Sequence, residues 1–143
     1  MSDGPARPVE AIVFSGRVAA GKGVAVGFTA SPWARQAFID LAGIDPFPGT
    51  LNLVVAAGPQ REAWARLKAA GGIRMAAPDP AWCDAFLFPV HLNESLPGAI
   101  VLPAVAGYDP AQVEIIAAVG LRAALGLADG DAVQVRATAV GAG

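Results

Sequence analysis

Glycine and proline interrupt this apolar chain at short intervals, and that feature most limits its fold. Of the 143 residues, 55% are hydrophobic, 17 are glycine and 12 are proline. The apolar runs therefore end well before the roughly 18 to 20 residues that a membrane span requires. Short strands joined by many turns are typical of a small closed β structure, a barrel or a sandwich, rather than a helical bundle. We predict a mainly β fold with minor α content and no membrane span.

The alternation of apolar and turn residues places the expected elements. Strands are expected at residues 11–19, 24–28, 50–55, 84–92, 99–102, 113–117 and 132–138. Gly21-Lys22-Gly23 separates the first two strands and predicts a hairpin-like connection. Helices are expected between the start signal Ser31-Pro32 and the stop at Gly43, from residue 59 through 70, and as a turn or two at 119–125.

Length and charge narrow the class of protein. A chain of 143 residues is of single-domain length. We expect residues 1–9 to be a flexible tail and residues 10–140 to form one domain. The net charge is −2 and the ten basic residues form no block or stripe, so a nucleic-acid partner is not expected. The N-terminus lacks the basic start and apolar run of an export signal, so we expect a cytoplasmic protein. The sequence leaves the oligomeric state open.

The chain has few residues for metal or nucleophilic chemistry. Cys83 is the only cysteine, so it has no second sulfur for a disulfide or a zinc site, and we expect a partly buried apolar role. His91 is the only histidine and has no nucleophile motif near it, so we expect a structural role.

Pro46-Phe47-Pro48-Gly49-Thr50-Leu51-Asn52 is the strongest candidate for a functional segment. If residues 50–55 form a strand, the hydroxyl of Thr50 and the carboxamide of Asn52 share one face. Two neutral oxygens suit a hard cation such as Mg²⁺ whose charge is balanced mainly by substrate phosphates. The alternative is a turn followed by a strand whose side chains only pack.

Three further sites carry polar groups in apolar or glycine-rich surroundings. Gly21-Lys22-Gly23 could bring backbone N–H groups and a lysine to a phosphate, or could be a plain hairpin turn. Glu114 lies in an apolar strand, so it either points outward or accepts specific hydrogen bonds. Arg122 could hold a ligand or form an ion pair with Glu114. Tyr108, the only tyrosine, lies in a loop and could stack on a flat ligand or cover a barrel mouth.

Taken in order, these segments resemble the archaeal CTP-dependent riboflavin kinase family. The resemblance spans about residues 16 to 136. It rests on five features: Gly16-x-Val18 before the Gly-x-Gly loop, Asp45 to Asn52, Pro103 with Tyr108, Glu114-Ile115-Ile116-Ala117 with Leu121-Arg122, and Asp129-Gly130-Asp131.

The resemblance implies a six-stranded cradle-loop barrel with two or three short helices. It implies transfer of the γ-phosphoryl group of CTP to riboflavin, giving FMN and CDP. In this chain Thr50 and Asn52 would ligate Mg²⁺, and Tyr108 and Glu114 would contact the flavin. The nucleotide would be bound by Gly21, Lys22, Gly23, Leu121 and Arg122. The expected partners are then small molecules.

Two segments differ from the family pattern. Gly23 is followed by Val24-Ala25, where the family usually has an acid and a third glycine. Val105-Ala106-Gly107 precedes Tyr108, where the family usually has a threonine and a basic residue or histidine. These apolar replacements favour an alternative function, a non-catalytic flavin- or nucleotide-binding module. A barrel used for protein association is a third hypothesis, since the high apolar content could supply an exposed patch.

Overall fold

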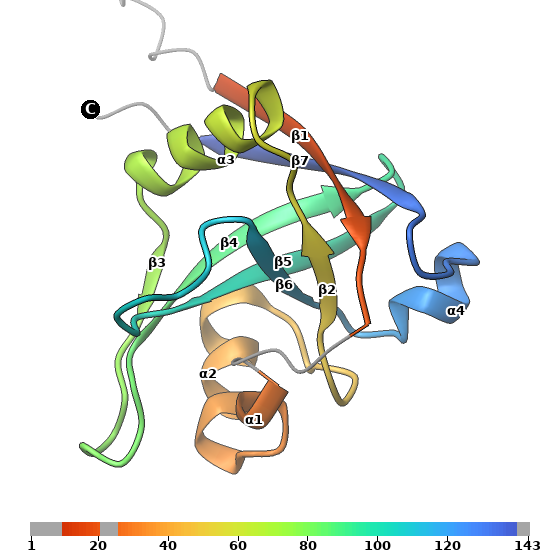
Figure 1. Cartoon of the computed structure of the whole chain (residues 1–143). Helices are drawn as coiled ribbons and strands as arrows, with labels where there is room; N and C mark the ends of the chain where they lie inside the picture. Colours follow the sequence, from red (N-terminus) through yellow and green to blue (C-terminus); the bar gives the residue numbers. More distant parts are fainter. Residues whose placement is uncertain (1–9, 21–25, 140–143) are drawn as a thin grey trace, which may run out of the picture.

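The structure of the chain is a computed structural model that describes residues 10–20 and 26–139 (Figure 1). Its elements follow one another in this order: β1 (Glu10–Val18), α1 (Val26–Thr29), α2 (Pro32–Ala42), β2 (Leu51–Val54), α3 (Pro59–Ala70), β3 (Ile73–Met75), β4 (Ala85–Leu92), β5 (Leu96–Pro103), β6 (Gln112–Ile116), α4 (Leu121–Leu125) and β7 (Ala132–Ala139). The expected tail at residues 1–9 and the Gly21-Lys22-Gly23 loop lie outside the described residues.

Six antiparallel strands close into a barrel. They follow the order β4, β5, β6, β2, β1, β7, and β7 pairs back with β4. The short strand β3 joins the same edge of β4 that β7 uses, because β3 pairs with residues 85–87 and β7 with residues 90–92. Pro89, which has no N–H to donate, lies between these two paired stretches. The predicted mainly β, six-stranded barrel is confirmed, and a sandwich is excluded.

Two apolar clusters hold the barrel and its covering helices together. The barrel interior is filled by strand residues and by Trp64 of α3, whose ring contacts Phe14 and Phe88 at centroid distances of 5.8 and 5.5 Å. A second cluster, which includes Phe28 of α1, Phe38 of α2 and Ile116 of β6, fixes α1 and α2 to the outer face of the sheet. In Figure 1, α3 lies at the top of the barrel and α1 and α2 lie at the bottom.

Proline and glycine set the helix ends, as predicted. Pro32 and Pro59 occupy the first turns of α2 and α3, where a missing N–H costs no helical hydrogen bond. Gly43 ends α2 in the left-handed conformation, and its N–H donates to the carbonyl of Ile39 at 3.0 Å. None of the helices in the described part of the chain is long and apolar enough to cross a membrane.

The predicted strand at residues 24–28 is wrong where the structure describes it. Residues Val26–Thr29 form helix α1. The two neighbours of β1 in the barrel are β2 and β7, so a hairpin partner after β1 has no edge to join. Phe28 is instead buried against Trp33 and Trp82 in the outer layer. Packing therefore overrides the strand preference of the local sequence, and four helices are described where two or three were expected.

Two further differences concern strands. β3 was not predicted, since three residues carry too little alternation to be recognised. β5 begins at Leu96, three residues before its predicted start, because Asn93 and Glu94 form a tight turn with φ of 49° and 54°. Pro97 and Gly98 hide this start in the sequence.

Candidate functional site

The pairing of β2 with β6 builds the centre of the site. Asn52 lies directly opposite Glu114 in the antiparallel register, so both side chains occupy the same face of the sheet. Leu51 and Leu53, the neighbours of Asn52, point into the barrel interior. Thr50, Asn52 and Glu114 therefore lie on the outer face of the barrel, which α1 and α2 cover further along.

Three side-chain oxygens converge on this face. Thr50 Oγ1 lies 3.4 Å from Asn52 Oδ1 and 3.4 Å from Glu114 Oε1. A hydroxyl has a single proton and donates to one of these acceptors at a time. The arrangement therefore places three hard oxygen atoms, one of them from a carboxylate, around one point.

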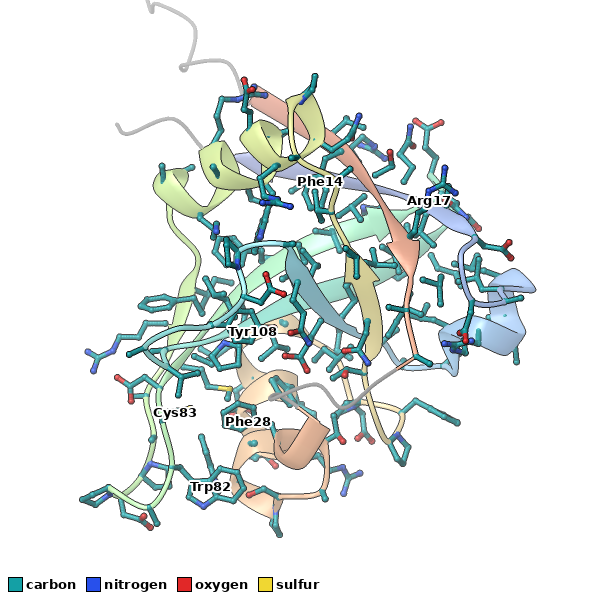
Figure 2. All side chains as sticks on the ribbon, viewed as in Figure 1. Phe14, Arg17, Phe28, Trp82, Cys83 and Tyr108 are labelled. Carbon is teal, nitrogen blue, oxygen red and sulfur yellow. The ribbon has the colours of Figure 1, made fainter. Side chains whose placement is uncertain are left out.

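Tyr108, in the connection between β5 and β6, adds a fourth oxygen to this group. Its hydroxyl donates to Glu114 Oε2 at 2.5 Å, and Glu114 is 0% exposed. Burial of the phenol, and then the carboxylate beside it, raise the pKa of Tyr108 well above its usual range, so the hydroxyl stays a neutral donor. Figure 2 shows Tyr108 near the middle of the molecule, beside this connection. We call Thr50, Asn52, Tyr108 and Glu114 the oxygen cluster.

The structure decides between the alternatives for Glu114, and it gives Arg122 a partner other than Glu114. Glu114 does not point to solvent, and it accepts hydrogen bonds as the second alternative requires. Arg122 donates to Asp129 at 2.6 Å, and this ion pair replaces the one considered with Glu114.

Contacts from α1 and α2 hold the turn that leads to Thr50. The N–H of Gly49, which has a φ of 94°, donates to Thr29 Oγ1 at 2.9 Å. Arg35 of α2 binds both carboxylate oxygens of Asp45 at 2.7 and 2.8 Å, and this guanidinium lowers the pKa of Asp45. Nothing in the sequence around Thr29 signalled its role, because the contact joins residues 20 apart in the chain.

Among the described residues, three cavities are each bordered by a member of the oxygen cluster. The turn cavity, of about 290 Å³, lies between the turn before β2 and the segment from β6 into α4, and Thr50 borders it. The Asn52 cavity, of about 230 Å³, is bordered by Asn52, Asp109 and Gln112. The Tyr108 cavity, of about 380 Å³, lies between the β5–β6 connection and α3. The cluster therefore has space for ligands on more than one side.

The predicted site residues fall into three groups: the oxygen cluster, the turn cavity and a loop that lies outside the described residues. Thr50, Asn52, Tyr108 and Glu114 come together in the oxygen cluster. Leu121 and Arg122 line the turn cavity, which Thr50 also borders. Gly21, Lys22 and Gly23 lie outside the described residues.

The oxygen cluster offers the hard oxygen ligands that a cation such as Mg²⁺ requires. Within the described ranges, no group of three or more His, Cys, Asp or Glu residues could hold a metal ion. A cation at this place would use Thr50 Oγ1 and Asn52 Oδ1. Adjacent ligands of an octahedral Mg²⁺ with bonds of about 2.0–2.1 Å lie roughly 3 Å apart, close to the 3.4 Å between these atoms. The donor set fits a hard cation.

Comparison with known proteins identifies relatives along most of the chain. The CTP-dependent riboflavin kinase family model, described as a domain of unknown function (DUF120), matches residues 18–137. A riboflavin kinase of Aeropyrum pernix is 37% identical over 127 residues, which cover 87% of this chain and 94% of that protein. A riboflavin kinase of Sulfurisphaera tokodaii is 33% identical over 123 residues, with coverage of 84% and 90%. This chain belongs to the CTP-dependent riboflavin kinase family.

Proposed function

We propose that the protein is a riboflavin kinase that uses CTP as its phosphoryl donor. Family membership supports phosphoryl transfer to riboflavin, and the family's name supports CTP. The single observation that carries the proposal is the convergence of the Thr50, Asn52 and Glu114 oxygens beside the turn cavity and the Asn52 cavity. Phosphoryl transfer needs positioned groups and neutralised charge more than covalent chemistry, which this set can supply.

The two substrates approach the oxygen cluster from different sides. The nucleotide occupies the turn cavity, with Leu121 and Arg122 along its wall and the Gly21-Lys22-Gly23 loop at its triphosphate. Riboflavin lies on the side of Tyr108 and Glu114. Donor and acceptor then meet at Thr50 and Asn52, an arrangement compatible with in-line transfer.

The reaction forms one bond and breaks one. The ribityl 5′-hydroxyl oxygen attacks the γ-phosphorus, the bond to the bridging oxygen breaks, and FMN and CDP result. Glu114, which is held by the Tyr108 hydroxyl and lies beside Thr50, would accept the hydroxyl proton. Thr50 and Asn52 would hold Mg²⁺, which would neutralise charge on the phosphates.

Chromatography of the reaction mixture tests the function. The protein is incubated with riboflavin, Mg²⁺ and one of CTP, UTP, ATP or GTP, and FMN is quantified. FMN is expected with CTP and not with the purine nucleotides. FMN formed equally well with ATP would contradict CTP dependence but not kinase activity. No FMN with any nucleotide would contradict the kinase.

Asn52→Ala tests the metal assignment. Loss of the carboxamide oxygen displaces an ion that contributes several kcal/mol of charge stabilisation, so kcat is expected to fall by orders of magnitude. Gln134→Ala is the matched control, since Gln134 is an exposed amide on β7, outside the oxygen cluster and the three cavities around it. Equal turnover in the two variants would remove Asn52 from the metal site.

A non-catalytic binding module is the second candidate. Small apolar residues at 105–107 line the Tyr108 cavity, where the family usually has polar side chains. Such a module would bind flavin or nucleotide and release no FMN.

A further inference from the structure

One wall of the turn cavity is the ring of Phe47, an aromatic residue that is 52% exposed. Its backbone is held in place, because the N–H of Phe47 donates to the carbonyl of Ala117 at 2.8 Å. In Figure 1 the turn before β2 lies beside the segment that runs from β6 to α4. The ring is therefore attached to a fixed backbone, but much of its surface is open to a ligand.

Gly120, in the segment between β6 and α4, lies next to the ring of Phe47. A Cβ atom at Gly120 would lie 3.2 Å from both Cε1 and Cζ of the ring. The backbone of Gly120 has φ of −69° and ψ of 108°, values that any residue adopts. Glycine is thus not required here by conformation. Its absence of a side chain lets the Phe47 ring lie directly against the chain.

The cavity is small and mainly apolar. Its volume of about 290 Å³ lies just below the roughly 300–1,000 Å³ typical of ligand pockets. Leu51, Ile115 and Leu121 contribute apolar wall, and Thr50 lies at its border. A ligand whose phosphates reach Thr50 therefore places a flat ring, rather than further charge, beside Phe47.

We propose that Phe47 is a specificity-determining residue that contacts the nucleotide base, and that Gly120 is the positioning residue that sets where its ring lies. The ring stacks on the base and limits the width of the cavity, so that a one-ring pyrimidine enters more readily than a two-ring purine. This inference rests on the proposed kinase function and extends it to the choice of nucleotide.

Steady-state kinetics of Phe47→Ala test the contact. Loss of one base–aromatic stack is expected to raise the KM for CTP roughly tenfold to a hundredfold. The ratio of kcat/KM for CTP to that for ATP falls, because the wider cavity no longer excludes a purine. The KM for riboflavin stays the same. Val13→Ala is the control, since Val13 is a similarly exposed apolar residue on β1, away from the cavity.

Gly120→Ala tests the positioning role without removing the ring. The added methyl would lie 3.2 Å from the ring and forces Phe47 to shift by a few tenths of an ångström, so a smaller loss of selectivity in the same direction is expected. In the Phe47→Ala background, Gly120→Ala has no further effect, because its action passes through the ring. Additive effects of the two substitutions would overturn the role of Gly120. Circular dichroism melts check that each variant is folded.

The outcomes separate this inference from the kinase proposal. If FMN is formed but Phe47→Ala leaves the KM for CTP and the CTP/ATP ratio unchanged, the inference fails and the kinase stands. A changed KM for riboflavin alone would also overturn it, since the cavity would then hold the flavin. If no FMN forms with any nucleotide, the kinase fails. Calorimetric titration with CDP then decides the inference, and equal affinity for wild type and Phe47→Ala overturns it.

Discussion

At the scale of single residues, Glu114 shows how a buried carboxylate is accommodated in an apolar strand. Burial of an ionised carboxylate is costly unless hydrogen bonds replace water. Tyr108 supplies one such bond from the β5–β6 connection, and Thr50 lies at the other carboxylate oxygen. A buried acid that the fold holds in this way is a typical feature of a functional site.

Tyr108 is the only tyrosine, so its ionisation can be followed directly by phenolate absorbance. We expect the folded protein to show no phenolate band until well above pH 10, because burial and Glu114 raise the pKa of Tyr108. In the unfolded chain the phenol of Tyr108 ionises with a pKa of about 10. The folded state holds the proton more tightly, so this contribution to stability is complete below pH 10 and is lost as the pH rises beyond it.

The control for that titration is the same protein in denaturant, which should titrate near pH 10. A folded protein whose phenolate appears at the same pH as in denaturant would contradict the Tyr108–Glu114 hydrogen bond.

At the scale of elements, the junction of β5 and β6 depends on a glycine. A Cβ at Gly98 would lie 2.8 Å from the backbone carbonyl oxygen of Ile116, a distance that requires a backbone shift. Ile116 pairs with Ala99 in the adjacent register, so the shift would act on the pairing that orients Glu114. The oxygen cluster thus depends on close packing two residues away along β6.

Gly98→Ala is expected to lower the free energy of unfolding by about 1–3 kcal/mol, the typical cost of overpacking. Chemical denaturation measures it. Gly27→Ala is the matched control, because a Cβ at Gly27 meets no atom of the described residues within 4 Å and Gly27 lies in α1. There alanine should be neutral or stabilise by up to about 1 kcal/mol. Equal effects of the two substitutions would show that the β5–β6 contact is not tight.

At the scale of the whole molecule, the site joins parts of the chain that meet only when the barrel closes. The oxygen cluster takes residues from β2, from β6 and from the connection before β6, and α1 supports the turn that leads to Thr50. A ligand that bridges these parts binds the folded state alone, so it stabilises the entire barrel.

We therefore expect CDP with Mg²⁺, and riboflavin separately, to raise the melting temperature. At a ligand concentration of 100 times Kd the stabilisation is about 2.7 kcal/mol. Asn52→Ala should lose the part of the CDP shift that depends on Mg²⁺, while Gln134→Ala keeps it. A shift without FMN formation would support the binding module. No shift with either ligand, together with a stable oligomer, would favour a barrel used for protein association.

Local patterns in the sequence determined much of this protein. Proline and glycine marked both ends of α3 at the observed residues. The period of two from residue 50 to residue 52 predicted Thr50 and Asn52 on one face, and their side-chain oxygens lie 3.4 Å apart. These features depend on neighbours in the chain, so a sequence carries them.

Only the tertiary structure decided the rest. Residues Val26–Thr29 are helical because the neighbours of β1 are already β2 and β7, which no local pattern encodes. Glu114 is buried beside Thr50, 64 residues away, because the register of β6 on β2 places them together. The sequence by itself determined which oxygen atoms were available. Closure of the barrel, through pairings between distant strands, decided which of them meet.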